Sequence, residues 1–177
     1  EIARDWKFRP LWRSGEFLED ALREYPKTCA AIEASGVRLH PWQDIACGFA
    51  RLPAKSSISR HCDGGLVSWT AHLALKSTFE ATLTVEDETR CWKEGEWLVF
   101  DSSRPHEAAN DSDEDRYVLL LHPLRDEAHD DQVDAVDHAL EATHPPLGVP
   151  HAVVLTPDGV AHSSWREYSP ERVVLAR

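Results

Sequence analysis

Residues 61–75 read HCDGGLVSWTAHLAL, and this stretch decides the fold. After the turn at Gly64–Gly65, apolar residues take every second position from Val67 to Leu75. The positions between them are more polar and hold Ser68, Thr70, His72 and Ala74. A period of two is that of a β-strand, whose alternate side chains point to opposite faces of a sheet. The stretch therefore predicts a strand with His72 on its more polar face.

Further short segments with strand-like composition lie on both sides of this stretch. They cover residues 45–52, 56–60, 79–85, 89–92, 97–100 and 116–122, and turn signals such as Glu86–Glu88 separate them. No helical pattern interrupts this part of the chain. Many short strands joined by turns are typical of a β-sandwich or barrel. We expect a mainly β fold, a double-stranded β-helix of the jelly-roll or cupin type.

The two ends of the chain differ from this β-rich centre. Residues 14–25 carry an apolar stripe behind Ser14, a capping residue, and so predict a helix. Residues 126–143 predict a second helix, and Pro157–Gly159 predict the turn of a hairpin. We expect residues 1–123 to form the jelly-roll domain with an N-terminal helical arm. Residues 124–177 then form a C-terminal extension packed on the same domain.

Composition narrows the partners and the location of the protein. The chain has 177 residues, 42% of them hydrophobic, which suits one domain with a real core. The net charge of −12 argues against a nucleic-acid partner, since phosphates would be repelled. No apolar run approaches the roughly 18 residues of a membrane span. The chain has no methionine, so we read it as a fragment or processed form. The compartment stays open, with a soluble protein of the cytoplasm favoured.

A candidate metal site combines residues from two distant segments. His61 and Asp63 are two positions apart, so on a strand both side chains point to the same side. His106 follows in a later segment and completes a set of two imidazoles and one carboxylate. Such a set leaves coordination positions open, as non-haem iron(II) oxygenases require. The alternative is a solvated turn beside Gly64–Gly65. The other histidines, among them His122, have no ligand-like partner in the sequence.

Arg116 stands at the start of an apolar strand, so its head group is expected in a partly buried place. A buried guanidinium needs an anion, and its planar fork suits a carboxylate. An acidic ligand of the metal site would meet this need. The alternative is a structural salt bridge to Asp113 or Asp115, which are close in sequence.

The central part of the chain resembles the aspartyl/asparaginyl β-hydroxylase family of iron- and 2-oxoglutarate-dependent dioxygenases. The resemblance covers residues 26–122, and its most specific part is the run W-x-E-G-x-x-x-x-F-D-x-S-x-x-H-E at 92–107. The other matching segments are Pro26–Cys29, His61–Asp63, His72–Leu75 and Arg116.

The resemblance implies a role for each matching residue. His61, His106 and Asp63 would be the catalytic iron ligands, with Asp63 at a position where some members have glycine. Arg116 would pair with the far carboxylate of 2-oxoglutarate, and His72 would lie near its other end. The implied reaction consumes O2 and 2-oxoglutarate and hydroxylates an amino acid, either free or in a peptide or protein. The β-carbon of Asp or Asn is the default target.

The chain departs from the family at two positions before His72. Ser68 and Thr70 stand where familiar members carry arginines that hold acidic groups of the substrate and the cosubstrate. We assign Thr70, with His72 and Arg116, to the cosubstrate side of the site. Either the substrate differs or another basic residue substitutes, and the candidates are Arg51, Lys55, Arg60 and Arg104. A non-catalytic jelly-roll module that binds metal and 2-oxoglutarate is the main alternative, and a zinc hydrolase with the same ligands is a weaker one.

Overall fold

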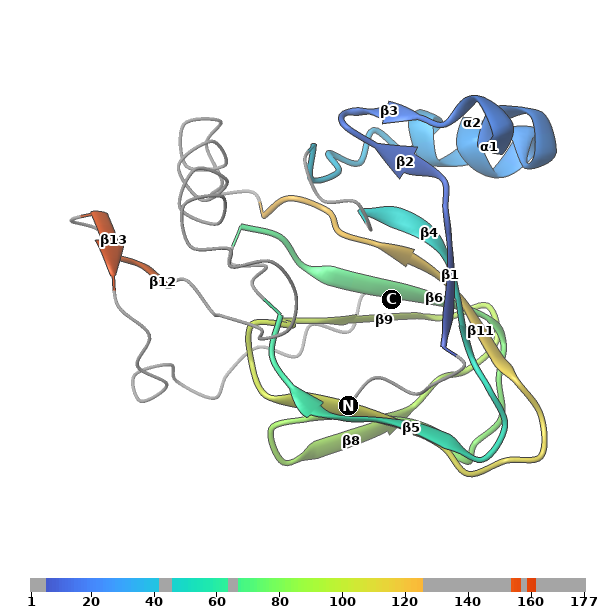
Figure 1. Ribbon diagram of the computed structural model, residues 1–177, viewed down its shortest axis with the longest axis vertical. Coiled ribbons are helices and arrows are strands. Elements are labelled where there is room, and N and C mark those ends of the chain that lie inside the picture. The colour runs from blue at the N-terminus through green and yellow to red at the C-terminus, as the bar shows by residue number, and fades with distance from the viewer. Residues whose placement is uncertain (1–5, 42–45, 64–66, 126–153, 157–158, 162–177) are drawn as a thin grey trace.

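The computed structural model describes residues 6–41, 46–63, 67–125, 154–156 and 159–161. Two antiparallel β-sheets face each other, and the N-terminal helices lie together at one end of them, at the top of Figure 1. The fold is mainly β, a double-stranded β-helix of the jelly-roll or cupin type, as the sequence predicts.

The first sheet has five strands in the order β1-β4-β11-β6-β9. Their bounds are β1 Lys7–Pro10, β4 Cys47–Leu52, β11 Arg116–Leu121, β6 Thr70–Lys76 and β9 Trp97–Phe100. The second sheet has the order β5-β10-β7-β8. Its strands are β5 Ser56–His61, β10 His106–Asn110, β7 Ala81–Val85 and β8 Glu88–Cys91. Strands far apart in sequence are therefore neighbours in space, which brings residues 61 and 106 together.

Strand β11 lies at the centre of the first sheet and contributes to two apolar clusters. Val118 and Leu120 pack between the two sheets, together with Leu83 and Phe100 from other strands. Leu119 and Leu121 belong to the second cluster, which includes helix residues such as Ala21, Cys29 and Ile32. Both faces of this strand are covered, which explains why residues 118–121 are continuously apolar rather than alternating.

The predicted N-terminal helix over residues 14–25 is only partly correct. Helix α1 covers Glu19–Glu24, and the residues before it form a small hairpin of β2 (Trp12–Arg13) and β3 (Glu16–Phe17). Ser14 and Gly15 make its turn with φ angles of 52° and 85°, a left-handed conformation that an α-helix does not contain. A second helix, α2, covers Pro26–Ala34, with its proline in the first turn, where no N–H is needed.

Gly48 lets β1 and β4 approach closely. A methyl group on its Cα would lie 2.4 Å from both the carbonyl oxygen of Arg9 and the Cζ atom of Phe8. We expect Gly48→Ala to lower the free energy of unfolding by about 1–3 kcal/mol, since overpacking forces the backbone to shift. Urea unfolding would measure the loss. Tyr117→Phe, a change at a partly exposed side chain, is the control, and equal stability of the two variants would contradict the expectation.

The described part of the C-terminal region is a hairpin. Strand β12 (Val154–Thr156) pairs antiparallel with β13 (Gly159–Ala161), which confirms the hairpin that the turn signal predicts. The helix predicted over 126–143 lies outside the described residues. In the described ranges no helix is long and apolar enough to cross a membrane.

Candidate metal centre

His61 and His106 are direct neighbours across a strand pair. His61 ends β5, His106 begins β10, and the antiparallel register places them opposite each other. The centroids of their imidazole rings are 4.2 Å apart. The pairing of β5 with β10 thus turns a separation of 45 residues in the sequence into contact.

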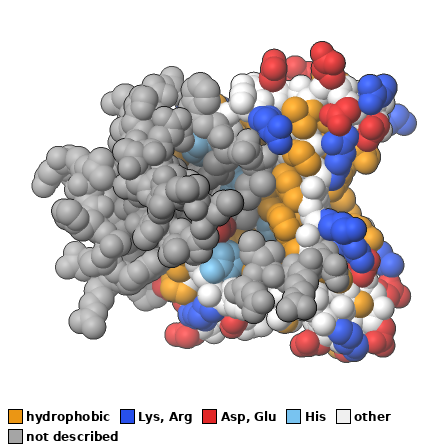
Figure 2. All heavy atoms as spheres, in the orientation of Figure 1, with side chains coloured by type: hydrophobic (Ala, Val, Ile, Leu, Met, Phe, Trp, Pro, Cys, Tyr) orange, Lys and Arg blue, Asp and Glu red, His pale blue; other side chains and the backbone are white. Residues whose placement is uncertain are grey.

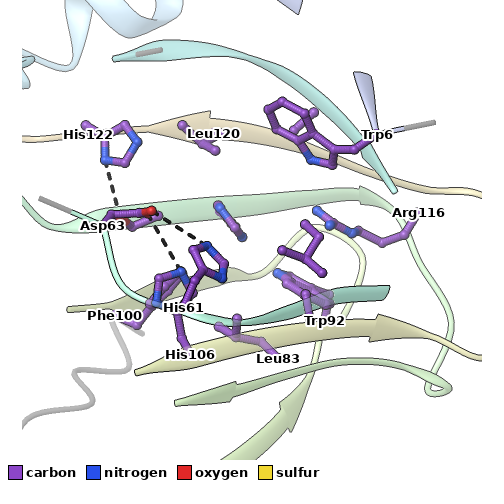
Figure 3. A pocket seen from close by; sticks show the side chains of 15 residues that line it. Trp6, His61, Asp63, Leu83, Trp92, Phe100, His106, Arg116, Leu120 and His122 are labelled. Carbon is purple, nitrogen blue, oxygen red and sulfur yellow. Dashed lines mark hydrogen bonds and ion pairs between the residues drawn. The ribbon is translucent and has the colours of Figure 1, made fainter. Parts of the chain in front are cut away.

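Asp63 completes the group from the segment after β5. Its backbone N–H donates to the carbonyl oxygen of Ser102 at 2.8 Å, which fixes the chain beside the two rings. Its carboxylate oxygens lie 3.6 Å from Nε2 of His61 and 3.7 Å from Nε2 of His106. One potential ligand atom from each residue lies within 4.8 Å of the others (Figure 3). Ligand atoms about 2.0–2.2 Å from one ion are about 3 Å apart, so a small contraction would accommodate a metal.

The hydrogen bonds of the two histidines orient them for metal binding. Nδ1 of His61 lies 2.8 Å from the carbonyl oxygen of Ser59, and Nδ1 of His106 lies 2.9 Å from that of Arg104. A carbonyl only accepts, so Nδ1 carries the hydrogen and Nε2 presents its lone pair toward Asp63. Burial lowers the pKa of His106, which favours the neutral form that a metal needs.

A cavity of about 150 Å³ extends from this group between the two sheets. Its apolar lining consists of Trp6, Ala50, Ile58, Leu83, Trp92, Phe100, Ala108 and Leu120. Its polar lining consists of His61, Asp63, Thr70, His72, His106, Arg116 and His122. All three predicted metal ligands and all three predicted cosubstrate residues therefore face one space. Histidine side chains are visible at the molecular surface in Figure 2, beside a band of hydrophobic side chains.

Arg116 lies at the end of the cavity opposite the metal group (Figure 3). It is 3% exposed, and its Nε and Nη1 atoms have no hydrogen-bond partner among the described residues. Its guanidinium packs over the ring of Trp92 at 4.3 Å, and burial lowers its pKa to about 9. The two acids close to it in sequence bind elsewhere, Asp115 to Arg51 and Asp113 to Lys55. The geometry thus supports an anion site rather than a structural salt bridge.

His72 and Thr70 lie between these two ends on β6. Both ring nitrogens of His72 are buried without a partner in the described part of the chain, and burial holds its pKa well below the usual value. Thr70 donates its hydroxyl hydrogen to Oγ of Ser102 at 2.8 Å. His72 therefore offers an unused neutral imidazole to the cavity, on the face that the alternation of residues 67–75 predicts.

The sequence did not indicate a role for His122, which nevertheless lines the same cavity. It is 3% exposed, its Nδ1 lies 3.3 Å from Oγ1 of Thr70, and its Nε2 has no partner among the described residues. Alternation could have identified it, because residues 116, 118, 120 and 122 share one strand face. Trp92 was also missed as a cavity residue, since tryptophan is more often read as core.

Two buried histidines make the metal-free protein sensitive to acid. Burial lowers the pKa of His40 and of His122 from 6.5 to about 4. Between pH 6.5 and pH 4 the unfolded chain therefore binds more protons at these two histidines than the folded chain does. Stability present above pH 6.5 is therefore lost as the pH falls, and by pH 5 each histidine contributes a loss of about 2 kcal/mol. Urea unfolding at pH 7 and 5 would measure the total loss, to which His72 and His106 also contribute, and His122→Phe should remove about 2 kcal/mol of it. An unchanged loss in that variant would contradict the assignment.

A family model and a curated relative agree with the resemblance seen in the sequence. A family model described as aspartyl/asparaginyl beta-hydroxylase matches residues 1–126. A protein of that name from Mus musculus is 30% identical over 125 residues, which cover 66% of this chain and 16% of the mouse protein. The chain thus corresponds to a small part of the length of that relative.

Solved structures with a similar arrangement include cupins. The cupin domain of Schizosaccharomyces pombe Cnp3 has a TM-score of 0.39 and 14% identity, over 45% of this chain and 55% of that one. A cupin protein from Bacteroides fragilis has a TM-score of 0.39 and 15% identity, over 47% and 68%. The family match covers well over half of the 177 residues and includes every residue of the metal group and the cavity. The chain therefore belongs to the aspartyl/asparaginyl beta-hydroxylase family.

Proposed function

We propose that this protein is an iron(II)- and 2-oxoglutarate-dependent dioxygenase that hydroxylates an amino acid, free or in a peptide or protein. One observation carries the proposal. Three potential metal ligands lie at one end of a cavity among the described residues, and a buried arginine whose Nε and Nη1 atoms have no partner there lies at the other end. A ligand with a metal-chelating end and a carboxylate at the other end suits both. Residues 1–123 form the dioxygenase-like unit in this proposal, and residues 124–177 are its extension.

The donor set fits iron. Two neutral imidazoles and one carboxylate occupy one face of an ion and leave other positions free, a pattern typical of iron(II) oxygenases. His61, Asp63 and His106 would hold it through the atoms that already converge. Iron bound with 2-oxoglutarate and O2 supplies the oxidation that turns a C–H bond into C–OH and yields succinate and CO2.

The other polar residues of the cavity would bind and orient 2-oxoglutarate. Arg116 would donate to the far carboxylate of 2-oxoglutarate, and its stacking on Trp92 holds the guanidinium in place. His72 and Thr70 would contact the end nearer the metal. The apolar lining limits water in the cavity, which strengthens these polar contacts because the local dielectric constant is low.

Succinate formation tests the proposal directly. Protein loaded with Fe(II) under nitrogen, then given 2-oxoglutarate and air, should form succinate slowly even without substrate. Proton NMR would quantify succinate, with zinc-loaded protein as the control. Absence of succinate together with absence of iron binding would rule the proposal out.

A non-catalytic module is the second candidate. Thr70 lines the cavity at a position where familiar relatives have arginine, so part of the usual binding chemistry is missing. Tight binding of 2-oxoglutarate with no succinate from the iron-loaded protein, whatever peptide is added, would favour this candidate.

A further inference from the structure

His122 faces the metal group from the opposite wall of the cavity. It follows the last residue of β11, and in Figure 3 its ring lies across Asp63 from His61 and His106. The side chain is nearly fully buried, and its Nε2 atom has no partner among the described residues. An unused polar atom at such a place incurs a desolvation penalty, which a ligand can relieve.

The hydrogen bonds around His122 decide which chemistry Nε2 offers. Thr70 gives its hydroxyl hydrogen to Ser102, so its oxygen accepts from Nδ1 of His122. In a neutral imidazole only one nitrogen carries hydrogen. Nδ1 therefore carries it, and Nε2 presents a lone pair to the cavity.

Positive charge that could attract a substrate carboxylate is already neutralised near this end. In the described part of the chain, five basic residues each lie within 4.0 Å of an acidic group. Four of them are the residues suggested above as substitutes, and the fifth is Arg125. The pairs are Arg60–Glu107, Arg104–Glu86, Arg125–Asp101, Arg51–Asp115 and Lys55–Asp113. Basic and acidic side chains also lie next to one another on the face in Figure 2. None of the four suggested substitutes lines the cavity.

A lone pair beside the metal group distinguishes between substrate groups. A carboxylate would place its own lone pairs against Nε2 and find no unpaired cation among the described residues nearby. An ammonium group would be repelled by the positive charge of the metal. A carboxamide is uncharged, and its N–H can donate to Nε2 of His122.

We propose that His122 recognises a carboxamide of the substrate, so that the residue hydroxylated is of the asparagine type rather than the aspartate type. This inference rests on the proposed function, because it places the substrate beside the metal. His122 acts as a specificity-determining residue, and Thr70 and Ser102 fix the orientation of its ring.

Binding of two matched probes to the manganese form tests this without turnover. The probes are the N-acetyl, N-methylamide derivatives of L-asparagine and L-aspartate. Wild-type protein is loaded with Mn(II) and 2-oxoglutarate in the absence of O2. It should broaden the proton signals of the asparagine probe at probe concentrations at least tenfold lower than those needed for the aspartate probe. His122→Leu should bring the ratio near one, and His122→Arg should favour the aspartate probe. Tyr117→Phe, on the same strand, should behave as wild type.

Three results would overturn the inference. They are equal or tighter binding of the aspartate probe to the wild type, an unchanged preference in His122→Leu, and no broadening of either probe. Manganese affinity and the melting temperature of each variant show whether it is folded. Succinate formation by the iron-loaded wild-type protein, measured without a probe, tests the proposed function separately. Selective binding of the asparagine probe, together with no succinate formation, would support the recognition site and contradict the proposed hydroxylase activity.

Discussion

His106→Ala should abolish metal-dependent succinate formation and weaken binding of Fe(II) or Mn(II) by more than about 100-fold. Loss of an outer-shell partner of a metal ligand already costs 10–100-fold, so loss of the ligand itself should cost more. The ring also lies beside Phe100, with centroids 5.3 Å apart, so some stability is lost as well. Isothermal titration with Mn(II) and NMR of succinate would measure the two effects.

The adjacent residue on β10 provides the control for this variant. Glu107 is more exposed than His106, and on a strand it points to the other face. Glu107→Gln should keep both metal affinity and succinate formation within about twofold. Wild-type metal affinity in His106→Ala would show that the converging atoms of residues 61, 63 and 106 are not the metal site.

The second large effect concerns Arg116, where function and stability should change in opposite directions. Arg116→Met removes the partner of a buried carboxylate, a loss of about 2–5 kcal/mol, so the Kd for 2-oxoglutarate should rise at least about 30-fold. The ligand-free protein should melt at a higher temperature, since an unpaired buried charge is replaced by an apolar side chain that still packs on Trp92.

A distant arginine separates this effect from a general loss of positive charge. Arg51 pairs with Asp115 at 2.7 Å and does not line the cavity. Arg51→Met should leave the Kd for 2-oxoglutarate unchanged and should not raise the melting temperature. Unaltered 2-oxoglutarate binding in Arg116→Met would remove the main support for a dicarboxylate cosubstrate.

Local periodicity predicted the parts of the fold that one strand can encode. The alternation around His72 placed it correctly on the cavity face, and the apolar run after Arg116 indicated a buried strand. Periodicity failed at residues 14–17, because Phe17 and Leu18 suit both a helical stripe and a hairpin. Only the backbone angles at Ser14 and Gly15 distinguish the two, and neighbouring contacts decide them.

The candidate site was predictable where its ligating residues lie close together in one segment of the sequence. His61 and Asp63 are two residues apart, so a strand explains their common direction. His122 was missed because its partner Thr70 comes from another segment, and only the fold brings the two together. The pairings of the arginines were equally hidden, since they join residues up to 64 positions apart.

Strand β11 carries Arg116 at its first position, and His122 follows its last. Hydrogen-bonded neighbours on both sides, β4 and β6, fix its register. Six residues of extended chain set the two side chains about 20 Å apart at most. A one-residue insertion or deletion in this strand would turn one of them away from the cavity. Within this strand, a point substitution at position 122 is therefore expected to change substrate choice while conserving the cosubstrate site.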